Sequence, residues 1–299
     1  MSTRKQYNRK KSYNHSENRG GFVKAKKSLG QNFLNDRVVV QDIVLCGEVE
    51  ACDAVIEIGP GRGAMTGELA SRAGLVIAVE IDKDLIPGLE ELARLCGNIE
   101  LIHGDILKLD VEKDIVDKYV RPRGLSKVKV IANLPYYITT PIIMKFLEDC
   151  PQLIDCMVIM VQKEVAQRMT AKPGGKDYGA MTVTVNYFTE PSIEFIVPPH
   201  CFSPQPGVDS AVVKLKMRSE PPFETPDRDY FFKTVKAAFL QRRKTLANAL
   251  ANSPMTSVSV SDVTEALAEM GLNVMARGET LSGEQFAELS GKLLRRKGK

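Results

Sequence analysis

Short apolar runs alternate with amphipathic stretches along the first half of the chain. The apolar runs predict buried β-strands over residues 54–58, 75–81, 99–102, 128–133 and 153–161. The amphipathic stretches predict helices that end near residues 46, 73, 96 and 149. Strands that alternate with helices in this way favour a parallel, doubly wound sheet, so the predicted fold class is α/β.

The pattern changes in the second half. Residues 180–188 fit a strand by their β-branched alternation and a helix by their length, so both remain open, whereas 193–197 and 208–217 predict two strands that pair at one edge of the sheet. Beyond a linker at 219–222 the periodicity is helical, with helices predicted over 225–251, from a cap at Asp262 to Gly271, and from a cap at Ser282 onward. We therefore predict an α/β domain over 28–219 and a small all-α domain over 220–299.

Size and composition are those of an ordinary globular protein. The chain has 299 residues, of which 43% are hydrophobic and 26% are charged. Its longest apolar stretch, 153–161, is too short to span a bilayer, and the N-terminus lacks the apolar region of a secretory signal. The six cysteines form no C-x-x-C pair, which argues against a metal site or a disulfide framework. A cytoplasmic protein without a metal or a membrane partner is the expectation.

The net charge of +4 conceals a basic N-terminal arm. Residues 1–27 contain nine Lys or Arg against Glu17 alone, a balance of +8, so the remaining residues sum to −4. A polar, basic arm of this kind is predicted to be disordered and able to neutralise phosphates. A solubilising tail with no specific partner is the alternative, and a mitochondrial transit peptide is a poor match.

A glycine-rich turn follows the first strand of the α/β region. Gly59, Gly61 and Ala64 fit the G-x-G-x-x-G/A fingerprint, and Glu80 lies about 20 residues further on, where a ribose-binding acid belongs. This predicts a nucleoside site but does not separate NAD from S-adenosylmethionine. Acidic strand ends at Glu80 and Asp105 suit a cationic ligand better, although Asp105 is also explained as a cap for the next turn.

The sequence Asn133-Leu-Pro-Tyr136 ends the fourth strand. The Asn133 side-chain oxygen and the Leu134 carbonyl are able to accept the two N–H bonds of an exocyclic amine, Pro135 makes the turn rigid, and Tyr136 offers a ring for stacking. Two such acceptors favour a pyramidal nitrogen whose lone pair is aimed at a methyl group, which is catalysis by positioning and electrostatics. The turn therefore favours methyl transfer over hydride transfer. The plainer interpretation is a strand end with a proline turn.

Further motifs accompany these two: Ser28-Leu-Gly-Gln-Asn-Phe-Leu34, Glu57-Ile-Gly-Pro-Gly-Arg-Gly63, Glu80-Ile-Asp82, Gly104-Asp105, Gln162-Lys-Glu164, Tyr178-Gly179, Phe202-x-Pro-x-Pro-x-Val-Asp-Ser210 and Phe239-x-Gln-Arg-Arg-Lys-Thr-Leu246. Together with Asn133–Tyr136 they resemble the bacterial small-subunit rRNA adenine dimethyltransferases from residue 28 to about residue 294. The resemblance implies a Rossmann-like class I methyltransferase domain followed by a helical RNA-docking domain. It implies S-adenosyl-L-methionine as cofactor and dimethylation of N6 on two adjacent adenosines in the 3′-terminal hairpin loop of 16S rRNA. The implied partner is the small ribosomal subunit or its precursor, bound by a monomer, with a role in subunit biogenesis.

The resemblance also assigns roles to residues. Positions that match the family's cofactor contacts are Asn32, Leu34, Gly59, Gly61, Glu80, Asp105 and Asn133. Glu80 is expected to hold the ribose hydroxyls and Asp105 the adenine amine. Asn133, Leu134, Pro135 and Tyr136 match the catalytic motif, and Tyr136 and Phe202 match the rings that sandwich the target base. Arg62 occupies a variable position of the glycine turn.

A basic run, Gln241-Arg242-Arg243-Lys244, is predicted to lie on the first helix of the C-terminal domain. Such a run is often just a solvated helix face, but beside an RNA-modifying domain Arg242, Arg243 and Lys244 are predicted to contact RNA phosphates.

Three alternative functions remain open. The erythromycin-resistance class, which methylates 23S rRNA, has very similar active-site motifs, although Tyr178-Gly179 and the segment 241–245 favour the 16S enzyme. A mainly non-catalytic ribosome assembly factor is an alternative from a different class, although it would tolerate loss of Asn133 and Tyr136, which are present. A dehydrogenase is a distant third.

Overall fold

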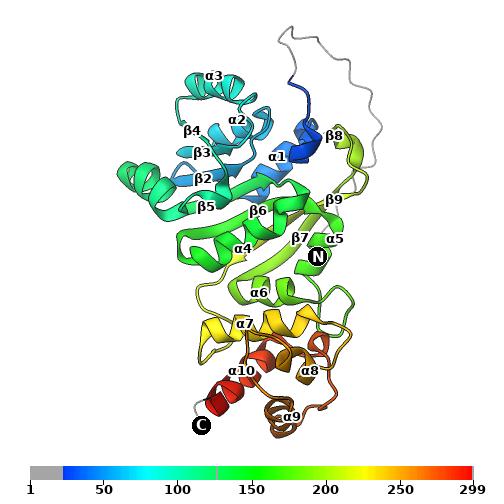
Figure 1. Cartoon of the computed structure of the whole chain (residues 1–299). Coiled ribbons are helices and arrows are strands. Elements are labelled where there is room, and N and C mark those ends of the chain that lie inside the picture. Colours follow the sequence, from blue (N-terminus) through cyan, green and yellow to red (C-terminus); the bar gives the residue numbers. More distant parts are fainter. Residues whose placement is uncertain (1–22, 126, 298–299) are drawn as a thin grey trace. The chain divides into compact units, whose positions relative to one another are not determined.

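The computed structural model, which describes residues 23–125 and 127–297, contains a seven-stranded sheet (Figure 1). Its strands run in the spatial order β4-β3-β2-β5-β6-β9-β7. Their bounds are β2 (Asp53–Ile58), β3 (Leu75–Glu80), β4 (Ile99–His103), β5 (Lys127–Asn133), β6 (Ile154–Gln162), β7 (Thr189–Val197) and β9 (Ser210–Met217). The first five of these in space are parallel, and β9 pairs antiparallel with β6. This mixed, mostly parallel sheet confirms the predicted α/β class.

The structure describes only part of the predicted basic arm, residues 1–27. Residues 1–22 lie outside the described residues. Residues 23–27, which were also predicted to be disordered, have defined positions, because Lys26 pairs with Asp82 and Asp84. Beyond them a two-stranded sheet joins β1 (Phe33–Leu34) to β8 (Phe202–Ser203), as Figure 1 shows.

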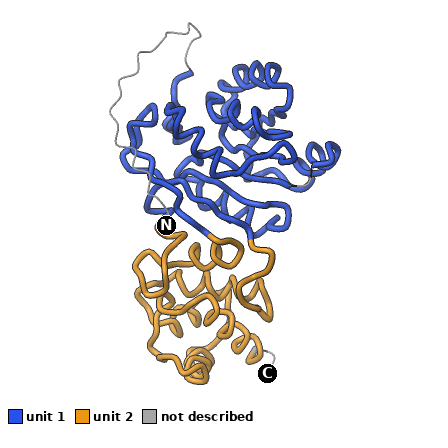
Figure 2. Tube along the Cα trace, turned by 180° about the vertical axis from the view of Figure 1, so that it is seen from behind, with its two compact units in different colours: residues 1–166, 191–217 blue, residues 167–190, 218–299 orange. Residues whose placement is uncertain are grey.

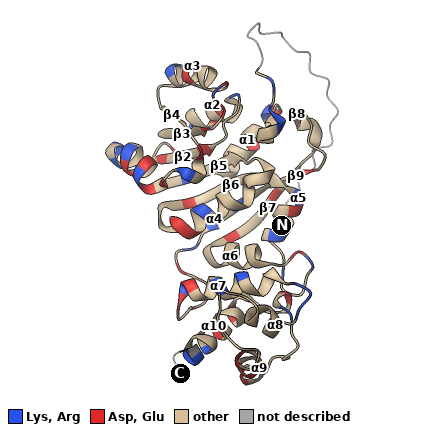
Figure 3. Cartoon of the chain, in the orientation of Figure 1, with Lys and Arg blue, Asp and Glu red and all other residues tan. Residues whose placement is uncertain are grey.

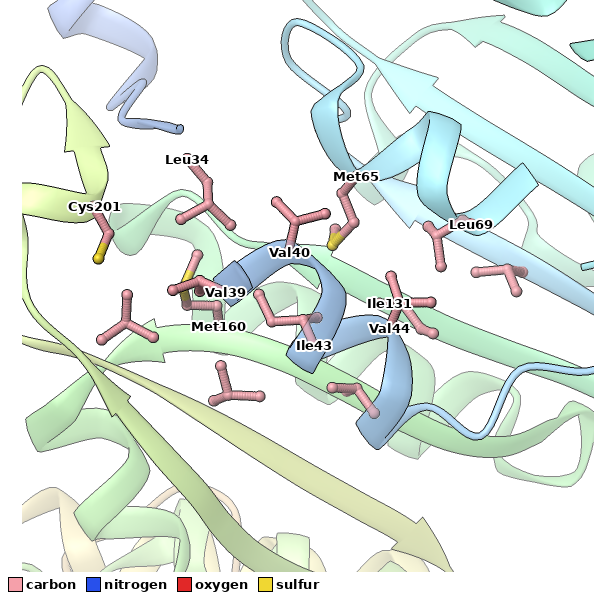
Figure 4. Close-up of a cluster of buried hydrophobic side chains, with 14 of the residues drawn as sticks. Leu34, Val39, Val40, Ile43, Val44, Met65, Leu69, Ile131, Met160 and Cys201 are labelled. Atoms are coloured by element: carbon pink, nitrogen blue, oxygen red, sulfur yellow. The ribbon is translucent and has the colours of Figure 1, made fainter. Parts of the chain in front are cut away.

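Helix α1 (Arg37–Cys46) covers the sheet with an apolar stripe. Asp36 caps it by accepting hydrogen bonds from Val38 N at 2.9 Å and Val39 N at 3.2 Å. Figure 4 shows its buried side chains among those of the strands. The cluster comprises Val39, Val40, Ile43 and Val44 of the helix with Ile131, Val158, Met160, Val197, Phe202 and Val212, among others. Burial of each large aliphatic group contributes roughly 1.5–3 kcal/mol.

The other helices of the α/β region connect the strands. They are α2 (Ala64–Ala70), α3 (Ile86–Cys96), α4 (Thr139–Asp149) and α5 (Lys163–Met169). Helix α4 ends at Asp149, as predicted. A π-helical segment, Val111–Val120, lies between β4 and β5 and was not predicted. Its Asp110 cap accepts a hydrogen bond from Lys113 N at 3.1 Å.

The chain divides into two compact units, drawn in blue and orange in Figure 2. Unit 1 contains residues 1–166 and 191–217, and unit 2 contains 167–190 and 218–299. Unit 1 ends at residue 217, two residues before the predicted end of the α/β domain at 219. The structure adds that residues 167–190 cluster with the C-terminal helices.

Unit 2 consists of helices around an aromatic cluster. Its helices are α6 (Ala180–Phe188), α7 (Arg228–Leu240), α8 (Leu246–Ala251), α9 (Val260–Glu269) and α10 (Gly283–Lys297). Tyr187 and Phe188 of α6 contact Phe231 and Phe232 of α7, with ring centroids between 5.2 and 5.5 Å apart. This packing explains why residues 180–188, ambiguous in the sequence, form a helix.

Two helix boundaries of unit 2 differ from prediction. The helix predicted over 225–251 is two helices, α7 and α8, separated at 241–245, because Thr245 starts a new helix by accepting a hydrogen bond from Asn248 N. Helix α9 is capped by Ser259 rather than Asp262, and Asp262 is the partner of Ser259 in the capping box. The cap of α10 by Ser282 and Gln285 is confirmed, at 2.9 and 3.2 Å.

Across the described part of the chain, every helix is too short or too polar to cross a lipid bilayer.

Candidate active site

A cavity of about 160 Å³ opens at the carboxyl ends of β2, β3, β4 and β5. This edge of a parallel sheet is where ligands bind in doubly wound folds. Ten of the eleven residues predicted to hold the cofactor or the target base line it: Asn32, Leu34, Gly59, Gly61, Glu80, Asp105, Asn133, Leu134, Pro135 and Tyr136. The exception is Phe202.

The glycine turn brings the backbone to the cavity. Gly59 and Gly61 have φ values of +67° and +59°, a region that residues with a Cβ rarely adopt. The Gly61 N–H donates to Glu80 Oε2 at 3.2 Å, and a Cβ added at Gly61 would lie 3.0 Å from the Phe33 ring. The turn is therefore closed around the end of the neighbouring strand, where only glycine fits.

Glu80 is held as an acceptor at the end of β3. Its side chain is 3% exposed and accepts hydrogen bonds from Gly61 N at 3.2 Å and from Asp82 N at 2.8 Å. Burial raises the pKa of its carboxyl group above the ordinary value. Because each oxygen accepts one N–H, each has a lone pair left for a ligand hydroxyl.

Glu57 is a pocket residue that the sequence analysis did not assign to the site. It is 1% exposed, and neither of its carboxyl oxygens has a hydrogen-bond partner among the described residues. Burial raises its pKa to about 8, which the neighbouring Thr66 hydroxyl opposes without reaching hydrogen-bond geometry. The sequence feature that indicates a role for Glu57 is its position as the first residue of the motif 57–63. With this pKa the carboxyl group is protonated near pH 7, and a buried polar group without a partner beside a cavity marks a candidate ligand-binding position.

Asp105 combines two predicted roles. Its Oδ1 accepts a hydrogen bond from Leu107 N at 3.0 Å, so it caps the turn after β4, and the same residue lines the cavity. The cap fixes the carboxyl group at the end of its strand.

The turn after β5 presents two acceptors. Asn133 Nδ2 donates to the Asn32 carbonyl at 3.2 Å, which orients the amide and leaves Oδ1 as an acceptor. Leu134 N donates to the Met160 carbonyl at 3.2 Å, whereas the Leu134 carbonyl accepts no hydrogen bond from any described residue. The Pro135 carbonyl accepts from Ile138 N and Thr139 Oγ1, which closes the turn. Both acceptors therefore belong to a rigid segment.

Tyr136 is fixed at its hydroxyl end. Its oxygen lies 2.7 Å from Ser210 Oγ, and Ser210 is fully buried at the start of β9. Burial also raises the pKa of Tyr136, so the phenol remains neutral near pH 7. Ser210 was not predicted as a site residue, although it ends the motif that begins at Phe202.

Phe202 takes a different position from the other predicted residues. It pairs with Leu34 between β1 and β8, and it is 3% exposed within the core cluster that also contains Leu34 and Met160. The structure thus brings it next to a pocket residue but does not place it in the cavity wall.

The basic run of unit 2 lies in a turn, which corrects the prediction that it lies on a helix. Arg242, Arg243 and Lys244 occupy the break between α7 and α8. Arg242 Nη2 donates to the carbonyls of Lys176 at 2.7 Å and Tyr178 at 3.2 Å, so it ties this turn to the loop before α6.

The residues lining the cavity fit S-adenosylmethionine better than a dinucleotide. Glu80 and Asp105 contribute acidic groups, whereas Arg62 is the single Lys or Arg among the lining residues. Glu57, whose pKa is raised to about 8, adds no negative charge near pH 7. A sulfonium cation with an α-amino group is attracted by this set, and a pyrophosphate is repelled. The charged groups that line the cavity therefore favour S-adenosylmethionine over NAD, a choice that the glycine turn alone left open.

Comparison with known proteins gives one consistent family. The family model described as "Ribosomal RNA adenine dimethylase" matches residues 22–290. A "Ribosomal RNA small subunit methyltransferase A" from Moorella thermoacetica is 49% identical over 89% of this chain and 91% of its own length. The protein of the same name from a Geobacillus strain is 47% identical over 90% and 91% of the two chains.

Solved structures agree with this result. A dimethyladenosine transferase from Plasmodium falciparum superposes with a TM-score of 0.70 at 25% identity, over 89% of this chain and 98% of that one. The 23S rRNA methyltransferase ErmE superposes with a TM-score of 0.64 at 28% identity, over 88% and 99%. The chain is thus far more similar to the small-subunit enzymes from Moorella and Geobacillus than to this 23S enzyme.

Proposed function

The chain belongs to the ribosomal RNA adenine dimethylase family, and we propose that it dimethylates N6 of two adjacent adenosines in the 3′-terminal hairpin loop of 16S rRNA. It is an S-adenosyl-L-methionine-dependent rRNA adenine dimethyltransferase. The observation that carries the choice of atom is the pair of acceptors after β5, Asn133 Oδ1 and the Leu134 carbonyl, in the wall of a carboxyl-rich cavity.

On the cofactor side, residues at strand ends do the holding. Glu80 is proposed to accept from the ribose hydroxyls and Asp105 from the adenine amine, with Asn32, Leu34, Gly59 and Gly61 forming the surrounding wall. S-adenosylmethionine supplies an activated methyl group on a positively charged sulfur. We propose that the acidic groups of Glu80 and Asp105 favour binding of this positively charged cofactor.

On the substrate side, the chain positions an amine. Asn133 and Leu134 accept its two N–H bonds, which favours the pyramidal geometry in which the nitrogen lone pair is available. Tyr136, fixed by Ser210, offers its ring for stacking, and Phe202 is proposed as the second ring. The base must leave its stack to reach them, at a cost of roughly a few kcal/mol that stacking on protein rings offsets. The proton leaves after methyl transfer, so the site needs no strong base.

Unit 2 is proposed to dock the RNA. Arg243 and Lys244 are exposed in the turn between α7 and α8, and Arg242 holds that turn against the loop before α6. Figure 3 shows Lys and Arg on several elements of this unit. We propose that the protein acts as a monomer in the cytoplasm, on the small subunit or its precursor, with residues 28–219 as the catalytic domain and 220–299 as the docking domain.

The test is methyl transfer from labelled S-adenosylmethionine to small subunits that lack these modifications, with the labelled nucleoside identified by mass. N6,N6-dimethyladenosine near the 3′ end of 16S rRNA is the expected product. Label in 23S rRNA, offered in parallel, would point to the erythromycin-resistance class. Tight subunit binding without incorporation would favour the non-catalytic assembly factor.

A further inference from the structure

A second hollow, of about 390 Å³, adjoins the active-site cavity. It is lined by Lys24, Ala25, Lys27, Gln31, Arg62, Ser203 and Pro204. Gln31 and Arg62 line both spaces. Three of the lining side chains are cations, and none of the described residues that line it is Asp or Glu. The hollow is therefore positive where the neighbouring cavity is rich in carboxyl groups.

The three lysines of the N-terminal segment, residues 23–27, differ in their partners. Lys26 Nζ lies 2.5 Å from Asp82 Oδ1 and 2.7 Å from Asp84 Oδ2, so its charge is neutralised. Lys24 and Lys27, on either side of it, are exposed and form no ion pair with any described residue. In this segment one lysine is therefore paired with carboxylates, and the other two line the hollow.

Arg62 forms the opposite wall and is held in place by the same segment. Its Nη2 donates to the Val23 carbonyl at 2.8 Å, and its guanidinium carbon lies 4.4 Å from the centre of the Phe33 ring. A stacked, hydrogen-bonded guanidinium has little freedom to lose when an anion binds. The sequence alone gave this variable position of the glycine turn no role.

The hollow lies between segments that carry parts of the active site. Ser203 and Pro204 directly follow Phe202, and Ser203 pairs with Phe33 between β8 and β1. Figure 1 shows the dark-blue N-terminal segment beside β8. The hollow therefore adjoins both the active-site cavity and the strand that carries Phe202.

We propose that this hollow binds a phosphate of the RNA strand next to the target adenosine. The inference rests on the proposed function and adds to it a site outside the cavity. The ligand class follows from the charges: two flexible lysines and one fixed guanidinium, without a carboxylate, suit a phosphodiester and not a cationic or apolar group. This contact orients the strand and carries no base specificity.

The experiment compares two double variants that remove the same charge. Lys24→Gln/Lys27→Gln empties the hollow of its lysines. Lys127→Gln/Lys216→Gln is the matched control, because these exposed lysines lie at the opposite end of the sheet, at the start of β5 and beside Cys156 of β6. Binding to unmodified small subunits is measured without a methyl donor at several salt concentrations, and S-adenosylmethionine affinity is measured by calorimetry.

We expect Lys24→Gln/Lys27→Gln to weaken subunit binding about tenfold at moderate salt and to reduce the slope of log K against log salt by about one. The control should change binding less than about twofold, and Lys24→Arg/Lys27→Arg should bind like the parent. Cofactor affinity should be unchanged throughout. Equal losses in both Gln variants, or no loss in either, would overturn the proposal.

The experiment distinguishes a failure of the phosphate site from a failure of the proposed function. If the parent methylates 16S rRNA but the lysine variants behave like the control, only the phosphate site is wrong. If the parent methylates no adenosine of 16S rRNA, the proposed function itself fails, whatever the variants do.

Discussion

The proposed cofactor side and the proposed base side of the active site are built differently. Gly61, Glu80 and Asp105 lie at the ends of parallel strands, and hydrogen bonds from backbone N–H groups fix both acids. The base side joins a similar strand end, Asn133–Tyr136, to Phe202, whose ring is packed in the core. Groups at the ends of the parallel strands are positioned by the seven-stranded sheet before any ligand arrives, whereas Phe202, on the short strand β8, takes its position from packing. The cofactor side is therefore preorganised throughout, and the base side only in part.

The largest loss should come from the preorganised part of the base side. Asn133→Ala removes the amide acceptor, and we expect the methylation rate to fall roughly 10²- to 10³-fold, the usual effect of removing one oriented electrostatic group. Subunit binding should remain nearly intact. Single-turnover methylation and subunit sedimentation measure the two. Unchanged methylation by this variant would rule out the amine-binding role.

On the cofactor side, Glu57 makes stability depend on pH. Because burial raises its pKa to about 8 from an ordinary 4.5, the protonated form is favoured on folding. This stabilisation is complete below pH 4.5 and is lost as the pH rises to about 8, by at most about 1.4 kcal/mol per pH unit. Glu57→Gln stays neutral, so we expect its melting temperature to fall less than that of the parent between pH 5.5 and 8. Glu91→Gln, the same change at an exposed site, should follow the parent; if Glu57→Gln does too, the buried carboxyl group is not the cause.

The variant Phe202→Leu tests whether the ring of Phe202 contacts the target base. The change keeps an apolar side chain in the core, so the free energy of unfolding should decrease by only about 1–2 kcal/mol. If the ring stacks on the base, kcat/KM should fall about tenfold. Phe195→Leu is the matched control, because Phe195 is buried in the same cluster. Equal losses of kcat/KM in both variants would mean that Phe202 acts through the core alone.

The smallest effect should come from the hydroxyl that holds Tyr136. Ser210→Ala removes its partner at 2.7 Å, and a hydrogen bond worth about 1 kcal/mol predicts roughly a fivefold loss of kcat/KM. Tyr136→Phe breaks the same bond from the other end. The double variant should therefore be no worse than either single one, and losses that add would show that the two hydroxyl groups act separately.

Much of the preorganised side could be predicted from the sequence, because strand ends carry local signals. Glycines with positive φ, an acid after an apolar run and a proline after Asn133 each report local geometry. Such signals say nothing about side chains that meet from distant segments. The contacts of Arg62 with Val23 and of Tyr136 with Ser210 join positions 39 and 74 residues apart, so they became visible only in the folded chain.

The break between α7 and α8 shows the same limit at the level of elements. Residues 241–244, Gln-Arg-Arg-Lys, all favour helix and contain no Pro or Gly, so periodicity predicts one helix through them. Tertiary contacts override this preference. Leu246 N donates to the Ala276 carbonyl at 2.7 Å, and Arg242 reaches the carbonyls of Lys176 and Tyr178. These partners lie 30 or more residues away in the sequence, beyond the range of any local signal.

The Leu134 carbonyl has a consequence for genetics. Of the two acceptors proposed to hold the amine, Asn133 offers a side chain and Leu134 offers only its backbone. A substitution at position 134 leaves that carbonyl in place unless it moves the backbone. The Leu134 side chain is itself buried in the core, where it is 1% exposed. A screen for inactive alleles should therefore find Asn133 readily, and should find Leu134 only through variants that also lower folding yield. Allele collections will understate the contribution of Leu134 to the reaction.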